Sequence, residues 1–119
     1  MSDAVDLEQK LASFDEIFAP RIVARLNENK VMVAKVQGEF VWHSHPDTDD
    51  FFLVLSGRLT IDLRDRTVEL GPGELFVVPR GVEHRPRAEE ETHILLIEPE
   101  GTPNTGDSRE REPAPEEEI

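Results

Sequence analysis

Residues 43–57, HSHPDTDDFFLVLSG, place two histidines directly ahead of an apolar run that ends in a Ser-Gly turn. Only one residue separates His43 from His45, so on an extended strand both imidazole rings point to the same face. Two neighbouring imidazoles are what a metal ion needs from a pair of adjacent ligands. A polar strand end at the surface explains the pair at least as well, because histidine is often exposed or half-buried. The spacing alone leaves both interpretations open.

Asp50 differs from the two aspartates before it because it continues the alternation of the strand that follows. If strand pairing begins near residue 50, Asp50 shares one face with Phe52 and Val54. A carboxylate among large apolar side chains is costly unless it is paired or bound to a metal ion. We therefore take Asp50 as a candidate ligand and interpret Asp47 and Asp49 as solvated loop charges.

The strand-like pattern extends from residue 21 to residue 98. Short β-rich runs alternate with turns that contain glycine or proline, and no helical period interrupts them. About eight strands are expected, over residues 21–26, 31–36, 40–45, 51–55, 58–63, 67–70, 74–78 and 92–97. Many short strands without intervening helices predict an all-β sandwich or barrel.

The two ends of the chain have a different character. Apolar residues recur at helical spacing over residues 4–18, where Ser13 and Glu16 form a possible capping box and Pro20 ends the pattern. We expect an N-terminal helical segment over residues 1–20 and a β-barrel domain over residues 21–106. Residues 107–119 form an acidic tail with almost no apolar side chain, and we expect this tail to be disordered.

The composition excludes several classes of function. The chain has 119 residues, enough for one domain with its own core, and no cysteine for disulfides, thiolate metal sites or nucleophiles. A net charge of −13 argues against nucleic acid and anionic membranes, which are bound through lysine and arginine. No apolar run has the length of a membrane span, and the N-terminus lacks the pattern of a secretory signal. We expect a cytoplasmic protein.

Two further histidines are candidates for the same site. His84 follows the turn at residues 79–81, which orients the next strand, but alone it is compatible with a surface position. His93 opens the last strand and shares a face with Leu95 and Ile97. Alternation does not decide which face is inward, and a half-buried histidine outside the pocket is favoured over a pocket role.

Two stretches together resemble the paired motifs of the cupin superfamily. GEFVWHSHPDTDDFFLVLSG, from Gly38 to Gly57, is similar to Gly-x5-His-x-His-x3–4-Glu-x6-Gly. GELFVVPRGVEHRPRA, from Gly73 to Ala88, is similar to Gly-x5-Pro-x-Gly-x2-His-x3-Asn. Each motif alone is a moderate indication, whereas both in order are a strong one. The chain most resembles small single-domain bacterial cupins of the mannose-6-phosphate-isomerase-like kind.

The sequence departs from these motifs at three positions. Four residues instead of five separate Gly38 from His43, and Ala88 stands at the asparagine position. The glutamate position, six residues before Gly57, holds Asp50, which is one methylene shorter. This aspartate either ligates directly from a closer strand, ligates through water, or leaves a three-histidine site as in the thiol dioxygenases of the superfamily. These alternatives remain open at this point.

The resemblance implies a cupin jelly roll, or double-stranded β-helix, with a short N-terminal helical segment. It implies a divalent transition metal (Mn, Fe, Co, Ni, Cu or Zn) bound by the candidate ligands His43, His45, Asp50 and His84. By alternation, the expected wall of the metal pocket consists of Phe52, Val54, Phe76 and Val78, with His93 at its rim.

Fold alone does not select a function, so several stay in view. A small metal-dependent enzyme of isomerase, lyase or dioxygenase type, acting on a small polar metabolite, is favoured. A non-catalytic cupin that binds a sugar or organic acid is the second interpretation, and a metal-free structural dimer is the third. Phe51, Leu53 and Leu55 form the face opposite Asp50, and this apolar face together with the resemblance favours a homodimer.

Overall fold

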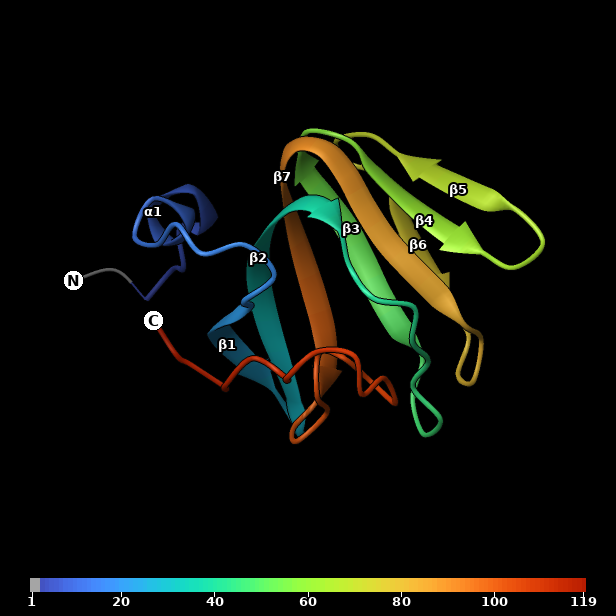
Figure 1. Ribbon diagram of the computed structural model, residues 1–119. Coiled ribbons are helices and arrows are strands. Elements are labelled where there is room, and N and C mark those ends of the chain that lie inside the picture. Colours follow the sequence, from blue (N-terminus) through green and yellow to red (C-terminus); the bar gives the residue numbers. More distant parts are fainter. Residues whose placement is uncertain (1–2) are drawn as a thin grey trace.

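The computed structural model describes residues 3–119 and confirms the predicted all-β fold with a short N-terminal helix (Figure 1). Residues 1–2 of the expected helical segment lie outside the described residues. The helix α1 spans Leu7–Leu11. The strands are β1 (Arg21–Leu26), β2 (Asn29–Glu39), β3 (Asp50–Ser56), β4 (Leu59–Leu63), β5 (Thr67–Leu70), β6 (Leu75–Val78) and β7 (His84–Pro99). None of the helical structure in residues 3–119 has the length and apolar character of a membrane-crossing helix.

The long strand β7 joins the two layers of the jelly roll. The larger layer has the antiparallel order β1-β2-β7-β3-β6, and the smaller one consists of β4 and β5 packed beside the first half of β7. β7 pairs with β3 over residues 93–97 and with β4 over residues 84–87, so it bends from one layer to the other, as Figure 1 shows. β2 bends with it through a bulge near Gly38, which has a φ of 83°.

The turn between β3 and β4 requires a glycine. Gly57 has a φ of 88°, and a Cβ atom there would lie 3.0 Å from the backbone Cα of Thr92. The fully buried Thr92 hydroxyl accepts a hydrogen bond from the Arg58 amide at 3.2 Å. The glycine six residues after Asp50 therefore lets the chain reverse directly against β7.

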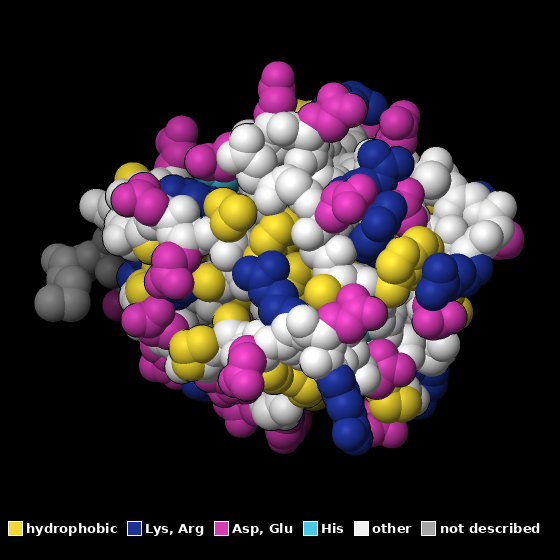
Figure 2. Space-filling view, viewed as in Figure 1, with side chains coloured by type: hydrophobic (Ala, Val, Ile, Leu, Met, Phe, Trp, Pro, Cys, Tyr) yellow, Lys and Arg dark blue, Asp and Glu magenta, His cyan; other side chains and the backbone are white. Residues whose placement is uncertain are grey.

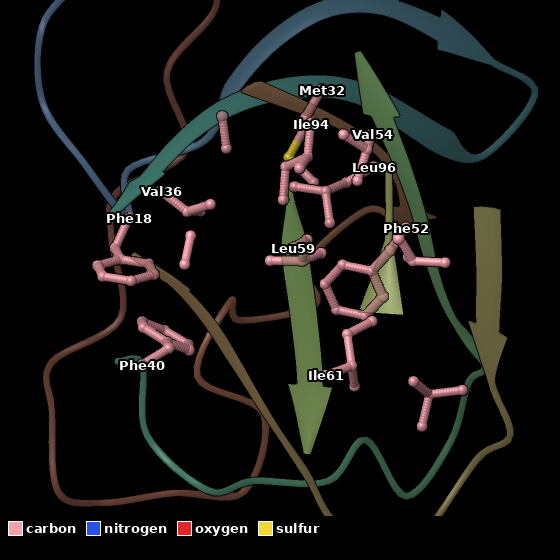
Figure 3. Packing of buried hydrophobic residues seen from close by; sticks show 14 of the residues in the cluster. Phe18, Met32, Val36, Phe40, Phe52, Val54, Leu59, Ile61, Ile94 and Leu96 are labelled. Atoms are coloured by element: carbon pink, nitrogen blue, oxygen red, sulfur yellow. The ribbon is translucent and has the colours of Figure 1, made fainter. Parts of the chain in front are cut away.

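The core fills the space between the two layers (Figure 3). Val54, Leu59 and Ile61 are fully buried, and Met32 and Phe52 are each only 3% exposed. Burying an aliphatic or aromatic side chain of this size stabilises a fold by about 1.5–3 kcal/mol. Every second residue of a strand points inward, and these inward side chains form one continuous cluster beside the histidines.

Two of the predicted strands differ in the structure. Residues 40–45 do not form a strand but carry an isolated bridge, in which the His43 and His84 amides donate to each other's carbonyl at 3.0 and 2.9 Å. The last strand begins at His84 instead of residue 92, because its first half pairs with β4. The bridge has a consequence for function, since it holds two of the candidate ligands side by side.

The N-terminal helix is shorter than predicted. It ends at Leu11, and Ser13 does not restart it but donates a hydrogen bond from its hydroxyl to the Lys10 carbonyl at 2.6 Å. Phe14 then packs with Leu11 against Val33 of β2. The apolar residues whose spacing predicted a helix to residue 18 instead belong, after Leu11, to an irregular segment that covers the outer face of β2.

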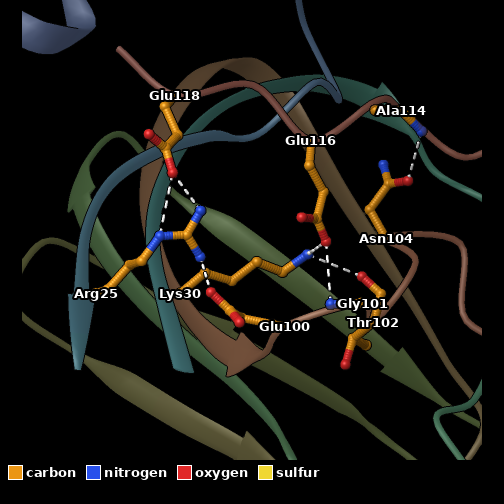
Figure 4. Close-up of polar contacts among 9 residues, drawn as sticks. All are labelled: Arg25, Lys30, Glu100, Gly101, Thr102, Asn104, Ala114, Glu116 and Glu118. Atoms are coloured by element: carbon orange, nitrogen blue, oxygen red, sulfur yellow. Dashed lines mark hydrogen bonds and ion pairs between the residues drawn. The ribbon is translucent and has the colours of Figure 1, made fainter. Parts of the chain in front are cut away.

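The C-terminal segment, residues 101–119, includes the tail over residues 107–119 that was expected to be disordered. It runs back along the barrel, where the Ile22 amide donates to the Glu117 carbonyl at 2.8 Å and the Ile119 amide donates to the Ile22 carbonyl at 3.0 Å. Figure 4 shows Arg25 pairing with Glu100 and Glu118, and other residues of the segment beside it. Acidic side chains nevertheless cover much of the surface seen in Figure 2, as the net charge of −13 requires.

Candidate metal centre

The four predicted ligands come together at one side of the barrel. His43 and His45 belong to the segment between β2 and β3, Asp50 is the first residue of β3, and His84 is the first residue of β7. All four are buried, with between 1% and 4% of their surface exposed. One ligand atom from each lies within 4.8 Å of the others. Strand alternation and the bridge between residues 43 and 84 together produce this cluster.

Backbone carbonyls fix the orientation of two of the rings. The Nδ1 atom of His43 lies 3.0 Å from the Val41 carbonyl, and the Nδ1 atom of His84 lies 2.9 Å from the Val82 carbonyl. A carbonyl only accepts hydrogen bonds, so each Nδ1 atom carries the proton. In the neutral ring the lone pair is then on Nε2, the atom that a metal ion would use.

Asp50 lies close to two of the other three candidate ligands. Its Oδ2 atom lies 2.9 Å from Nε2 of His84 and 3.3 Å from Nε2 of His45. Lone pairs at such a distance repel each other unless a proton or a metal ion lies between them. The aspartate is therefore long enough to present its carboxylate where the histidine Nε2 atoms converge.

The protonation states suit a metal site. Burial raises the pKa of Asp50, but hydrogen bonds to His45 and His84 outweigh it and lower the pKa to about 2. Burial, together with the charge of His84, lowers the pKa of His43 to about 4, so this ring is neutral near pH 7. Burial also lowers the pKa of His45, but the hydrogen bond and charge of Asp50 outweigh burial and raise it.

The donor set fits a divalent transition metal. Three imidazoles and one carboxylate are ligands that Mn, Fe, Co, Ni, Cu and Zn all accept, and thiolates play no part in a chain without cysteine. A carboxylate with a low pKa and a neutral imidazole with its lone pair on Nε2 need little rearrangement to bind such an ion. The four side chains can therefore hold a metal, and their chemistry does not determine which one.

The cluster borders a mostly apolar cavity inside the barrel. Of the four strand residues expected to wall it, Phe52 lines the cavity. Val54 and Val78 are instead buried in the core, and Phe76 packs against that core. The remaining wall consists largely of apolar side chains: Phe18, Pro20, Ala34, Val36, Phe40, Pro86, Ile94 and Leu96. The cavity thus excludes most polar contacts except at a few positions.

The expectation that His93 lies at the pocket rim is corrected by the structure. The His93 side chain is 25% exposed, and its Nε2 atom lies 2.7 Å from a carboxylate oxygen of Glu91. On β7 the buried positions are Ile94 and Leu96, so alternation turns His93 to the outer face. Once Leu96 is known to line the cavity, the direction of every other residue in this half of β7 follows.

Two polar residues of the cavity were missed by the sequence reasoning. Glu98, which is 4% exposed, lines it from β7, and Asn104 lines it from the C-terminal segment. Glu98 has the same parity as Ile94 and Leu96, so alternation contained the information. No pattern in the sequence pointed to Asn104.

The C-terminal segment also contacts the segment between β2 and β3 that carries the two neighbouring histidines. Asp107 accepts hydrogen bonds from the amide and the hydroxyl of Ser44, at 2.7 and 2.8 Å. The Asp107 amide in turn donates to the Ser44 carbonyl at 3.0 Å. A Cβ atom at Gly106 would lie 2.9 Å from the His43 ring, so only glycine allows this close approach. Three hydrogen bonds therefore hold the residue between His43 and His45 in place.

Residues 30–98 match the cupin domain family. The chain belongs to the cupin superfamily. This cupin is 34% identical over 96 residues to the uncharacterized protein YdbB of Bacillus subtilis, which covers 80% of this chain and 79% of YdbB. The superfamily resemblance of the two motifs is thereby confirmed.

Solved structures agree with this assignment. The crystal structure of a protein of Shewanella frigidimarina that contains a cupin-2 domain has 44% sequence identity and a TM-score of 0.80, over 81% of this cupin and 94% of that chain. A Neisseria meningitidis protein has 32% identity and a TM-score of 0.74, over 82% of this cupin and 99% of that chain. The cupin fold is shared with both.

Proposed function

We propose that this cupin is a metal-dependent enzyme that acts on a small polar metabolite. The observation that carries the proposal is the convergence of His43, His45, Asp50 and His84 within 4.8 Å of one another at a buried cavity. When bound there, a divalent transition metal would polarise a carbonyl or enediol oxygen of the metabolite or bind dioxygen. Isomerase, lyase and dioxygenase chemistry all remain within this proposal, as does the mannose-6-phosphate-isomerase-like subgroup.

Asp50 is proposed as a direct ligand. Its Oδ2 atom is within 3.3 Å of the Nε2 atoms of His45 and His84, which supports direct ligation over a water-mediated contact. The carbonyl bonds to Nδ1 of His43 and His84 leave Nε2 as the nitrogen of each ring that would bind a metal ion. The apolar wall of the cavity keeps water away from a bound metabolite and strengthens electrostatic contacts within the site.

The second proposal is a cupin that binds a small sugar or acid without turnover. It is favoured by the ion pairs of the two charged residues that flank His84. Glu83 pairs with Arg64 at 3.4 Å, and Arg85 pairs with Asp62 at 2.9 Å. Since Glu83 is engaged outside the cavity and an arginine stays protonated, neither residue is available as a general base.

A homodimer is proposed from the outer face of the larger sheet. Phe51 pairs with both Val77 and Ile97, and Leu53 pairs with Leu75 and Leu95, which gives two adjacent apolar rows. Leu75 is 55% exposed and Val77 is 40% exposed. An apolar face on an edge strand of a chain this acidic fits a second copy of itself. Light scattering at micromolar concentration should give the dimer mass, whereas a monomer would refute the proposal. A cytoplasmic location stays a prediction.

Metal analysis of protein purified without a histidine tag tests the proposed enzyme. We expect about one transition metal per chain, and a melting temperature that rises when Mn, Fe, Ni or Zn is added to stripped protein. Less than about 0.2 metal per chain with an unchanged melting temperature would sink the proposal. Stoichiometric metal without turnover or oxygen uptake across a metabolite panel would favour the binding protein instead.

A further inference from the structure

The cavity contains a second carboxyl group, Glu98, which the candidate metal centre does not use. Glu98 lies near the end of β7 and points inward with Ile94 and Leu96. It is 4% exposed and lines the same cavity as His45 and Asp50. Its position therefore gives it access to any small molecule that occupies the cavity beside the metal.

The Glu98 carboxyl has no hydrogen-bond or ion-pair partner among residues 3–119. The obvious candidate is Lys30, which lies directly opposite it on β2. Lys30 instead donates hydrogen bonds to a Glu116 carboxylate oxygen at 2.8 Å and to the Thr102 carbonyl at 3.0 Å. Figure 4 shows its ammonium group directed to these two residues of the C-terminal segment. The cation that would neutralise Glu98 is thus engaged elsewhere.

A buried carboxyl without a partner costs stability. Burial and the charge of Asp50 raise the pKa of Glu98 to about 8, so the group resists ionisation. An apolar side chain at this position would carry no such cost. Groups kept in unfavourable surroundings inside a cavity are characteristic of functional sites.

We propose that Glu98 contacts the ligand, by hydrogen bonding to a hydroxyl group on a small molecule whose other end coordinates the metal. This inference rests on the proposed metal site. A hydroxyl both donates and accepts, so it satisfies the carboxyl in either protonation state. A carboxylate in its place would be repelled whenever Glu98 is ionised. Phe18, Phe40 and Leu96 are among the apolar residues that line the cavity, so we expect the part of the ligand between its two polar ends to be a short carbon chain.

The test uses matched hydroxamate probes on the Zn²⁺-loaded protein. Each probe chelates the metal through its hydroxamate, and within each pair the terminal methyl of a straight-chain acyl group is replaced by a hydroxyl, for three chain lengths. In calorimetry on wild type, we expect the hydroxyl probe of the fitting length to bind about tenfold more tightly than its methyl partner. In Glu98→Met we expect this ratio to fall to about one or to invert, with zinc content unchanged.

Asp62→Asn is the matched control, because Asp62 is another buried carboxyl but pairs with Arg85 and Arg87 outside the cavity. It should leave the hydroxyl preference at its wild-type value. Equal preference in wild type and Glu98→Met, or no hydroxyl preference in wild type at any length, would overturn the role of Glu98. Wild type that holds no zinc would overturn the metal site first and this inference with it, so zinc content separates the two failures.

A second measurement detects ligand binding at Glu98 in the wild-type protein itself. In wild type labelled with ¹³C at the glutamate carboxyl, the Glu98 signal should shift when the fitting hydroxyl probe is added and stay in place with its methyl partner. The Glu98→Gln protein assigns the signal by its absence. An unchanged Glu98 signal at saturating hydroxyl probe would contradict the proposal.

Discussion

Asp50 and Glu98 are two carboxyl groups in one cavity, equally buried at 4% exposure, yet they are held in opposite states. Asp50 faces the histidine side, where hydrogen bonds to His45 and His84 lower its pKa to about 2 in spite of burial. Glu98 has no such partner among residues 3–119, and burial together with the charge of Asp50 raises its pKa to about 8. We call Glu98 and the apolar wall of the cavity the apolar side. Partners, and not depth, therefore decide which carboxyl is charged. Two carboxyls separated in this way are suited to different tasks, one to hold a cation and the other to exchange hydrogen bonds with a ligand.

The histidine side should respond most strongly to mutation. His45→Ala removes a ligand and leaves the Asp50 carboxylate without one of its partners. We expect metal affinity to fall by more than about 100-fold, as loss of a whole ligand exceeds the 10–100-fold typical of its supporting contacts. Competition with a chromogenic chelator measures it. His93→Ala, on the outer face of β7, is the control and should leave affinity unchanged. Equal metal content in wild type and His45→Ala would break the assignment.

The second-largest effect is expected from acid, which should release the metal ion from the histidine ligands. The pKa of His45 is raised, and that of His43 is lowered to about 4, so as pH falls His45 takes up a proton first. Because a ligand must be unprotonated to bind, affinity should be constant above the pKa of His45 and fall about tenfold per pH unit below it. Metal binding measured between pH 4 and pH 9 tests this. Affinity independent of pH over this range would contradict histidine ligation.

The apolar side should respond with the opposite sign. Glu98→Met removes an unpaired carboxyl, so we expect the metal-free protein to gain about 1–3 kcal/mol in free energy of unfolding at pH 9. The folded pKa is about 8 and the ordinary value 4.5, so folding retains a proton and the wild type loses stability as pH rises between these values. The gain should therefore be small near pH 4 and complete above pH 8. Urea unfolding at both pH values measures it.

Asp62→Asn provides the matched control for Glu98→Met. Asp62 is also buried, but Arg85 and Arg87 donate to it at 2.9 and 2.8 Å, and these bonds help hold its pKa below the ordinary value against the effect of burial. Its replacement should lower stability near pH 7, where Glu98→Met raises it. If both variants lose stability, the idea that Glu98 is kept at a cost to the fold is wrong.

The smallest effect is expected where the C-terminal segment supports the histidine side. Asp107→Ala removes two hydrogen bonds to Ser44, between His43 and His45, and should cost about 1 kcal/mol of unfolding free energy. Metal affinity should fall several-fold as the two rings lose their alignment. Glu112→Ala, an exposed glutamate of the same segment, should change neither quantity. Metal affinity of Asp107→Ala equal to wild type would show that the segment does not position the ligands.

The histidine side was predictable from the sequence, and the apolar side was not. The alternation of side chains along a strand predicted that Asp50 shares a face with Phe52. The two cupin motifs predicted that His84 joins His43, His45 and Asp50, as it does in the structure. The sequence does not show which face of β7 points inward, but one contact, such as Leu96 lining the cavity, determines it. Alternation then directs Glu98 into the cavity and His93 to the outer face. A fixed period leaves the choice of face open until tertiary packing makes it.

At the two ends of the chain, the extent of the helix and the path of the last residues differ from the prediction for another reason. Helical spacing in residues 4–18 reported which side chains bury, but Phe14 buries against β2 from an irregular segment. The C-terminal segment contains few apolar residues, and its order comes from backbone bonds to Ile22 and ion pairs with cations such as Lys30. A prediction from composition considers only how much apolar surface a segment can bury, and it does not detect backbone hydrogen bonds or ion pairs.

The most direct test of the account is a crystal structure of the tag-free protein, with anomalous scattering recorded at the transition-metal absorption edges. We predict one ion bound by Nε2 of His43, His45 and His84 and by a carboxylate oxygen of Asp50, with the Glu98 carboxyl not bound to it. An ion at any other position, or a direct contact between His84 and Asp50 with no anomalous signal after soaking in metal, would contradict it.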